Sequence, residues 1–125
     1  MSEDLVRLVA LDVMARRGLE GELSVTFVGA DEIHCLNRDF LGHDYETDCL
    51  TFDLADEGPG DLLGEVIVNI DQADREADER GLDYEEELLR YVVHGVLHLA
   101  GEEDDTGEQK SRMSRLESEV LRRFR

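Results

Sequence analysis

The sequence predicts a small α+β fold in which a mixed β-sheet packs against helices. Two patterns carry this prediction: short β-branched segments that alternate apolar and polar residues, and longer segments with apolar residues at helical spacing. A length of 125 residues and a hydrophobic content of 41% suit one domain with its own core. We therefore expect residues 1–125 to form a single domain.

The first half of the chain predicts two helices and two strands. In order, these are a helix over about Glu3–Arg17 ended by Gly18, a strand over Glu22–Val28, a short helix capped by Asp31 and, after a polar loop over Leu41–Asp48, a strand over about Cys49–Leu54. The segment Asp56–Asp61 contains a Gly-Pro-Gly run and is the clearest turn in the sequence.

The second half predicts a third strand and three helices. These are a strand over Gly64–Ile70, a polar helix over Asp71–Arg80 ended by Gly81, a long helix over Tyr84–Ala100 capped by Asp83, and a last helix over about Glu108–Phe124. The long helix is apolar on nearly every face, which is typical of a helix buried at the centre of a domain.

This buried helix carries His94 and His98, which predict a metal site. Because residues four apart share one face of a helix, both imidazoles can reach the same ion. Gly101 then ends the helix and returns an acidic run, Glu102 to Asp105, towards the histidines. One oxygen ligand from this run would complete three protein ligands and leave an open position, which is the pattern of a catalytic zinc.

The alternative is that both are core histidines whose imidazoles are satisfied by backbone or carboxylate partners, without a metal. Their shared spacing on an otherwise apolar helix favours ligation, because burying two imidazoles without partners is costly. The position after the first histidine argues against a zinc peptidase. Such enzymes have glutamate there as general base, whereas this chain has Gly95.

The charge balance is strongly acidic. Thirteen basic residues against 32 acidic ones give a formal net charge of −19, and Lys110 is the only lysine. Because the acids are spread through every segment, we interpret them as a surface suited to high salt, where self-repulsion is screened. The last helix carries several arginines, which we expect to pair within that helix with Glu108, Glu117 and Glu119: Arg112, Arg115, Arg122, Arg123 and Arg125.

No segment predicts export or membrane insertion. No apolar run approaches the length needed to cross a bilayer, and the N-terminal segment has acids before its apolar residues and arginines after them, the reverse of a secretory signal. Cys35 and Cys49 are too few for a disulfide framework. We therefore expect a cytoplasmic protein with reduced thiols.

Three short motifs precede the histidine helix and form an ordered set of four with it. In order, the four are Leu36-Asn37-Arg38, Thr47-Asp48-Cys49-Leu50-Thr51-Phe52, Leu63-Gly64-Glu65-Val66 and His94-Gly95-Val96-Leu97-His98-Leu99-Ala100-Gly101. Together, over roughly Leu23 to Met113, they resemble the signatures of the YbeY family of bacterial rRNA-maturation endoribonucleases.

The resemblance implies a metal-dependent, single-strand endoribonuclease that acts on rRNA precursors of the small ribosomal subunit. Carried over by position, the family's zinc ligands fall on His94, His98 and Asp104. Asp104 stands where the family has a third histidine. An aspartate there lowers the Lewis acidity of the metal relative to three neutral imidazoles and favours harder metals more than imidazole does.

Residues around the predicted metal ligands are expected to have further roles. Glu103 is expected either as proton acceptor or as hydrogen-bond partner of a ligand histidine. Arg38 and Asn37 are expected to contact an RNA phosphate, although packing and capping of their helix explain them equally well, and Asp48 and Thr51 are expected to line or brace the cleft. Many members carry an arginine after the Leu-Asn motif, and here that position is Leu41.

Two other classes of function stay open at this point. The protein could be a ribosome-assembly factor with a structural metal and weak or no nuclease activity, which Leu41 favours. It could also be a metal-dependent hydrolase of another substrate, such as a small ester or nucleotide. Metal removal would unfold a protein with a structural ion, whereas a catalytic site can lose its metal and stay folded.

Overall fold

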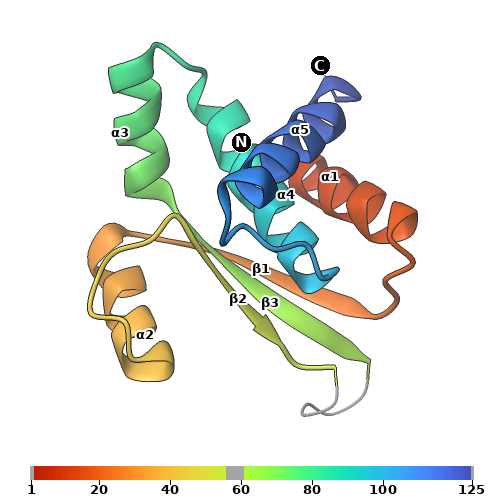
Figure 1. Cartoon of the computed structure of the whole chain (residues 1–125), viewed down its shortest axis with the longest axis horizontal. Helices are drawn as coiled ribbons and strands as arrows, with labels where there is room; N and C mark the ends of the chain where they lie inside the picture. The colour runs from red at the N-terminus through yellow and green to blue at the C-terminus, as the bar shows by residue number, and fades with distance from the viewer. Residues whose placement is uncertain (1, 56–60, 125) are drawn as a thin grey trace.

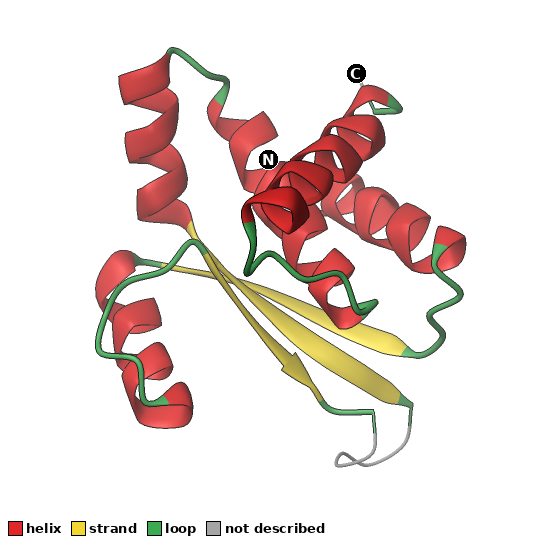
Figure 2. Ribbon diagram, viewed as in Figure 1, coloured by secondary structure: helices red, strands yellow, loops and turns green. Residues whose placement is uncertain are grey.

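A three-stranded mixed sheet divides the helices between its two faces in the computed structural model, which describes residues 2–55 and 61–124 (Figure 1). The elements are α1 (Glu3–Arg16), β1 (Glu22–Val28), α2 (Ala30–Leu41), β2 (Cys49–Asp53), β3 (Leu62–Asn69), α3 (Ile70–Arg80), α4 (Tyr84–Leu99) and α5 (Gly107–Arg122). Figure 2 shows α1, α4 and α5 gathered over one face of the sheet and α2 on the other. The predicted α+β fold with a mixed sheet is confirmed.

The strand β3 lies in the middle of the sheet, in the order β1-β3-β2. It runs parallel to β1 and antiparallel to β2, where Cys49 pairs with Val68. Because side chains alternate along a strand, Val66 and Val68 join the core beneath α4, whereas Ile67 joins the smaller core beneath α2. Burial on both faces explains why Val66, Ile67 and Val68 of β3 form a continuous apolar run rather than an alternating pattern.

The helix α4 is the centre of the larger core, as its all-round apolar pattern predicts. Its buried residues come from every face of the helix, and it packs against α1, α3, α5 and the sheet. Asp83 caps its start, because the Asp83 carboxylate accepts a hydrogen bond from the Glu86 N–H at 3.0 Å. Gly101 follows its C-cap with a φ of 97°, and this left-handed conformation turns the chain back.

Gly95 allows α4 to lie unusually close to the sheet, between the two histidines. A Cβ atom at this position would lie 2.5 Å from Val66 Cγ1 and 2.9 Å from Cys49 Sγ. Both distances are far below the 3.5–4.0 Å at which heavy atoms attract each other, and Val66 is fully buried. The glycine therefore sets the separation between α4 and the two strands at the level of the candidate site.

The start of α2 differs from the prediction. Its N-cap is Gly29, which offers no side chain, and the Ala30 N–H donates instead to Asp71 Oδ2 at 2.8 Å. The expectation that Asp31 caps this helix is wrong, because the cap comes from the first turn of α3. Leu41 also belongs to α2 rather than to the loop. The other boundaries lie within two residues of those expected, and residues 56–60 of the expected Asp56–Asp61 turn lie outside the described residues.

Arg112 of α5 and Arg123, which follows this helix, pair with other elements. Arg112 pairs with Glu102 of the preceding loop, and Arg123 pairs with Asp12 of α1. Glu117, an expected partner within α5, instead pairs with Arg90 of α4 at 3.1 Å. The predicted pairing within the helix is wrong for these residues, and the ion pairs observed fasten α5 to its neighbours.

Both cysteines are free, as expected. Burial raises the pKa of the Cys49 thiol, and the nearby carboxylates of Asp48 and Glu117 raise it further, so this thiol stays protonated. Among the helices over residues 2–55 and 61–124, none combines the length and the apolar character that crossing a bilayer requires.

Candidate metal centre

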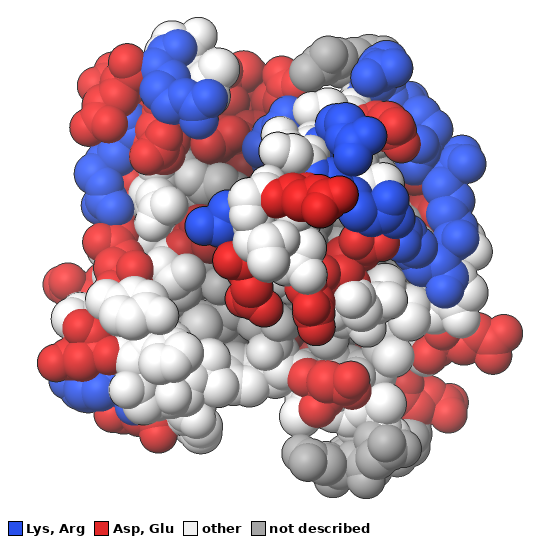
Figure 3. Space-filling model, in the orientation of Figure 1, with Lys and Arg blue, Asp and Glu red and all other residues white. Residues whose placement is uncertain are grey.

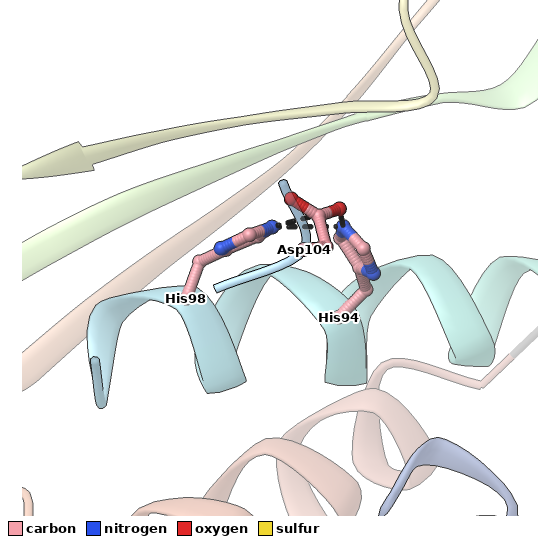
Figure 4. A group of neighbouring side chains, drawn as sticks. All are labelled: His94, His98 and Asp104. Atoms are coloured by element: carbon pink, nitrogen blue, oxygen red, sulfur yellow. Dashed lines mark hydrogen bonds and ion pairs between the residues drawn. The ribbon is translucent and has the colours of Figure 1, made fainter. Parts of the chain in front are cut away.

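Three side chains converge where α4 ends and the chain turns back. His94 and His98 project from α4 and Asp104 from the loop before α5, and they point towards one another (Figure 4). The two Nε2 atoms are 3.0 Å apart, and Asp104 Oδ2 lies 3.3 Å from Nε2 of His94 and 3.5 Å from Nε2 of His98. Zinc bonds of about 2.0–2.1 Å in a tetrahedron place ligand atoms about 3.3–3.4 Å apart. The three distances therefore fit one face of a zinc tetrahedron.

The hydrogen bonds of the imidazoles decide which ring nitrogens face this centre. His94 Nδ1 lies 2.6 Å from a carboxylate oxygen of Glu117, and His98 Nδ1 lies 2.9 Å from the backbone carbonyl of Glu102. Carboxylate and carbonyl oxygens only accept, so each neutral ring carries its proton on Nδ1. Both Nε2 lone pairs then face each other and Asp104. A cation between these three electron-rich atoms removes their repulsion. Without a cation, two core histidines in this arrangement would keep that repulsion, although their Nδ1 atoms are satisfied.

The surroundings of His94 are strongly negative. Burial lowers its pKa, but the hydrogen bond with Glu117 and the charges of Asp48, Glu117 and Asp104 outweigh burial, and the pKa of His94 is raised overall. The same carboxylates would attract a metal cation. Protons and metal therefore compete for this imidazole, since only its neutral form can bind a metal.

Glu117 is the residue of the site that the sequence analysis missed as a partner of His94. Its side chain is 9% exposed, and its second oxygen accepts from Arg90 Nη1 at 3.1 Å. A signal was present, because Glu117 lies on the apolar stripe of α5 together with Met113 and Val120, which are buried. An acid on such a stripe needs partners inside the protein.

Glu102 holds the loop that carries Asp104. Its carboxylate accepts from Arg17 Nη1 at 2.8 Å and from Arg112 Nε and Nη2 at 3.0 Å each. These hydrogen bonds lower the pKa of Glu102 to about 2, and the one from Arg112 contributes most. Because Arg17 follows α1 and Arg112 lies on α5, these contacts fix the loop between two helices. The backbone carbonyl of Glu102 in the same loop orients His98.

A comparison with known families decides what kind of chain this is. The family model described as endoribonuclease YbeY matches residues 2–125. The chain belongs to the YbeY family. The endoribonuclease YbeY of Chlorobaculum tepidum is 38% identical over 121 residues, which cover 97% of this chain and 87% of that protein. The endoribonuclease YbeY of Geobacillus thermodenitrificans is 36% identical over 132 aligned residues, which cover 98% of this chain and 83% of that protein.

A solved structure has the same fold. The solution structure of TM1509 from Thermotoga maritima matches with a TM-score of 0.65 and 31% sequence identity, over 97% of this chain and 82% of that one. The family and the α+β fold expected from the sequence motifs are thus both confirmed for this YbeY member.

The other predicted site residues on the metal side of this YbeY fold separate into two groups. Asp48 lines a cavity of about 240 Å³ beside His94 and Asp104. Glu103 is exposed and accepts a hydrogen bond from Gln109 Nε2 at 3.3 Å. The hydrogen bond to a ligand histidine, considered as its alternative role, is made by Glu117 instead.

Three further residues lie outside that cavity. Thr51 belongs to β2, where it pairs with Val66 and is half-buried. Asn37 and Arg38 belong to α2, on the other face of the sheet. Asn37 is buried and donates to the Tyr45 carbonyl at 2.9 Å, and Arg38 is half-exposed and pairs with Asp39 at 3.0 Å. Packing accounts for Asn37, while an RNA contact by any of the three stays a prediction.

Proposed function

We propose that this YbeY member is a zinc-dependent endoribonuclease of single-stranded RNA, and that its substrate is precursor rRNA of the small ribosomal subunit in the cytoplasm. The observation that carries the proposal is the convergence of two Nε2 lone pairs and the Asp104 carboxylate at 3.0–3.5 Å. The names of the relatives, endoribonuclease YbeY, support the reaction.

The donor set fits zinc, because two imidazole nitrogens and one carboxylate oxygen are ordinary zinc ligands that leave a fourth position open. When bound, zinc supplies a Lewis acid that acidifies water and polarises a phosphodiester. The protein's own residues orient the site: Glu117 holds His94, and the Glu102 carbonyl holds His98. We assign proton acceptance to Glu103, which is exposed next to Asp104.

The substrate residues follow from the same proposal. Asp48, which lines the cavity beside His94, would position RNA at the metal. Asn37, Arg38 and Thr51 would contact RNA that extends beyond this cavity.

The first test is the metal content of protein purified in high salt, with His98→Ala as the variant and His43→Ala as the matched control. His43 is exposed and stacks on Tyr45, away from the converging ligands. We expect one equivalent of zinc in the native protein and in His43→Ala, and none in folded His98→Ala. Cleavage of a single-stranded RNA should follow the zinc content.

Metal-free native protein that stays folded and does not take up added zinc would overturn the metal site. Zinc binding without cleavage of single-stranded RNA would overturn the nuclease proposal and leave the site intact.

A second candidate is a ribosome-assembly factor whose zinc is structural. The observation that favours it is Leu41, which is 45% exposed at the end of α2 where many members carry arginine. Thermal unfolding with and without a zinc chelator separates the two candidates. A structural ion predicts unfolding on chelation, whereas the proposed catalytic site predicts loss of cleavage with retained helical circular dichroism.

A further inference from the structure

The cavity next to the metal centre contains a cation that the site itself does not use. This cavity of about 240 Å³ lies between α4 and α5 and is lined by His94, Asp104, Asp48, Arg90, Lys110 and Glu117, among others. Two of the three proposed metal ligands, His94 and Asp104, thus line this cavity. A phosphodiester bound in this cavity would lie beside these side chains.

Of the two cations in the cavity, Arg90 is already occupied. Its Nη1 donates to Glu117 at 3.1 Å, its Nη2 donates to Ser118 Oγ at 3.2 Å, and its Nε lies 4.0 Å from Glu87. The charge of the guanidinium is therefore largely balanced by Glu117, the same carboxylate that orients His94. Little of this charge remains for a ligand.

Lys110 is different. It is exposed on the first turn of α5 and forms no ion pair with any carboxylate in residues 2–55 and 61–124. Most arginines of the chain have such a partner, and the other described cations without one are Arg115 and Arg122, which do not line the cavity. The chain's only lysine is therefore its only described unpaired cation at the metal centre.

We propose that Lys110 binds a backbone phosphate of single-stranded RNA in this cavity, next to the phosphodiester at the metal. The inference rests on the proposed nuclease function and adds a substrate contact to it. In a chain with a net charge of −19, long-range attraction for RNA is absent, so binding depends on local cations that each displace a counterion. An unpaired ammonium is suited to this, because a lysine contacts phosphate as a point charge and needs no second partner.

The test compares Lys110→Gln with Arg115→Gln, which removes the same charge from an exposed position on the same helix. The probe is a short, nuclease-resistant 2′-O-methyl RNA, with zinc-loaded protein and fluorescence anisotropy over a series of salt concentrations. We expect Lys110→Gln to weaken binding about 3- to 10-fold at low salt and to reduce the slope of log K against log salt by about 0.7, the value for one single-strand phosphate. Arg115→Gln should stay within about 2-fold, Lys110→Arg should restore binding, and zinc content should be unchanged in all variants.

Equal weakening by both glutamine variants would overturn the inference, since the effect would be one of total charge. Unchanged RNA affinity in Lys110→Gln, with native protein that binds and cleaves RNA, would overturn the Lys110 contact and leave the proposed function standing. Zinc-loaded native protein that does not bind RNA would overturn both.

Discussion

At the scale of single residues, the contact between Glu117 and His94 has the clearest expected effect on metal binding. Glu117 fixes the proton of His94 on Nδ1, which leaves Nε2 free for a metal. Losing such a partner typically weakens metal binding about 10- to 100-fold, so we expect this loss for Glu117→Ala and a smaller one for Glu117→Gln, whose amide oxygen still accepts the Nδ1 proton.

Competition with a chromophoric zinc chelator measures this effect. Glu119→Gln is the matched control, because Glu119 is exposed on the same helix, and it should bind zinc as the native protein does. Native zinc affinity in Glu117→Ala would show that His94 needs no help from α5. Circular dichroism of the metal-free variants separates lost affinity from lost structure, since the removal of Glu117 also leaves Arg90 without this partner.

At the scale of elements, the loop between α2 and β2 is fastened to α3 through Glu46. Asn69 Nδ2 donates to Glu46 at 2.7 Å and to the Thr47 carbonyl at 3.1 Å, while Arg75 of α3 pairs with the same carboxylate. Asn69 also caps α3. These contacts hold the loop in one conformation up to Asp48, which lines the cavity beside His94.

The contacts of Glu46 with Arg75 and Asn69 give a pH-dependent prediction. The hydrogen bond from Arg75, then that from Asn69, lowers the pKa of Glu46 below its ordinary value of 4.5. A lowered pKa in the folded state stabilises the fold above the unfolded pKa, and this stabilisation is lost as pH falls through the folded pKa. The free energy of unfolding of Glu46→Gln should therefore lie below that of the native protein at neutral pH, and the two should converge as pH falls through the folded pKa of Glu46, which lies below 4.5.

Urea unfolding at several pH values measures the difference. Glu20→Gln is the control, because Glu20 is exposed and forms no ion pair within residues 2–55 and 61–124. A constant gap between native protein and Glu46→Gln at all pH values would mean that packing, and not charge, carries the effect of Glu46.

The sequence was sufficient for elements whose signals are local. The apolar periodicity of α4, its Asp83 cap and its histidine spacing depend on residues within a few positions of each other. The features that it did not predict join distant segments: the start of α2 is capped by Asp71, and Glu117 reaches His94 from another helix. Such partners depend on the packing of elements, which no local pattern encodes.

At the scale of the whole molecule, charge dominates. On the face drawn in Figure 3, Lys and Arg side chains gather on the right, towards α1 and α5, with a second group at the upper left over α3, and acidic side chains are scattered over the face. Individual exposed ion pairs contribute about 0–1 kcal/mol each. The repulsion among 32 acids with 13 cations extends over the entire surface at low salt, and we expect it to outweigh these pairs.

This balance predicts that salt stabilises the protein. Raising KCl from about 0.1 M to about 1 M shortens the Debye length from about 10 Å to about 3 Å, so self-repulsion falls and Tm should rise by several degrees. Scanning calorimetry across the KCl series, repeated with NaCl to exclude a specific effect of potassium, measures this change. A Tm that falls as salt is added would show that the ion pairs outweigh the repulsion.

The close approach of α4 to the sheet at Gly95 restricts the chemistry that this scaffold can acquire. A zinc peptidase takes its general base from a glutamate directly after the first histidine. Any side chain at that position here would begin inside Val66, since its Cβ would lie 2.5 Å from Cγ1. Substitution at that position alone therefore cannot convert this metal centre into a peptidase of that type. As long as β2 and β3 keep their packing against α4, a catalytic base has to come from a loop or a neighbouring helix. New reactions at this metal centre therefore require changes in residues outside the histidine helix.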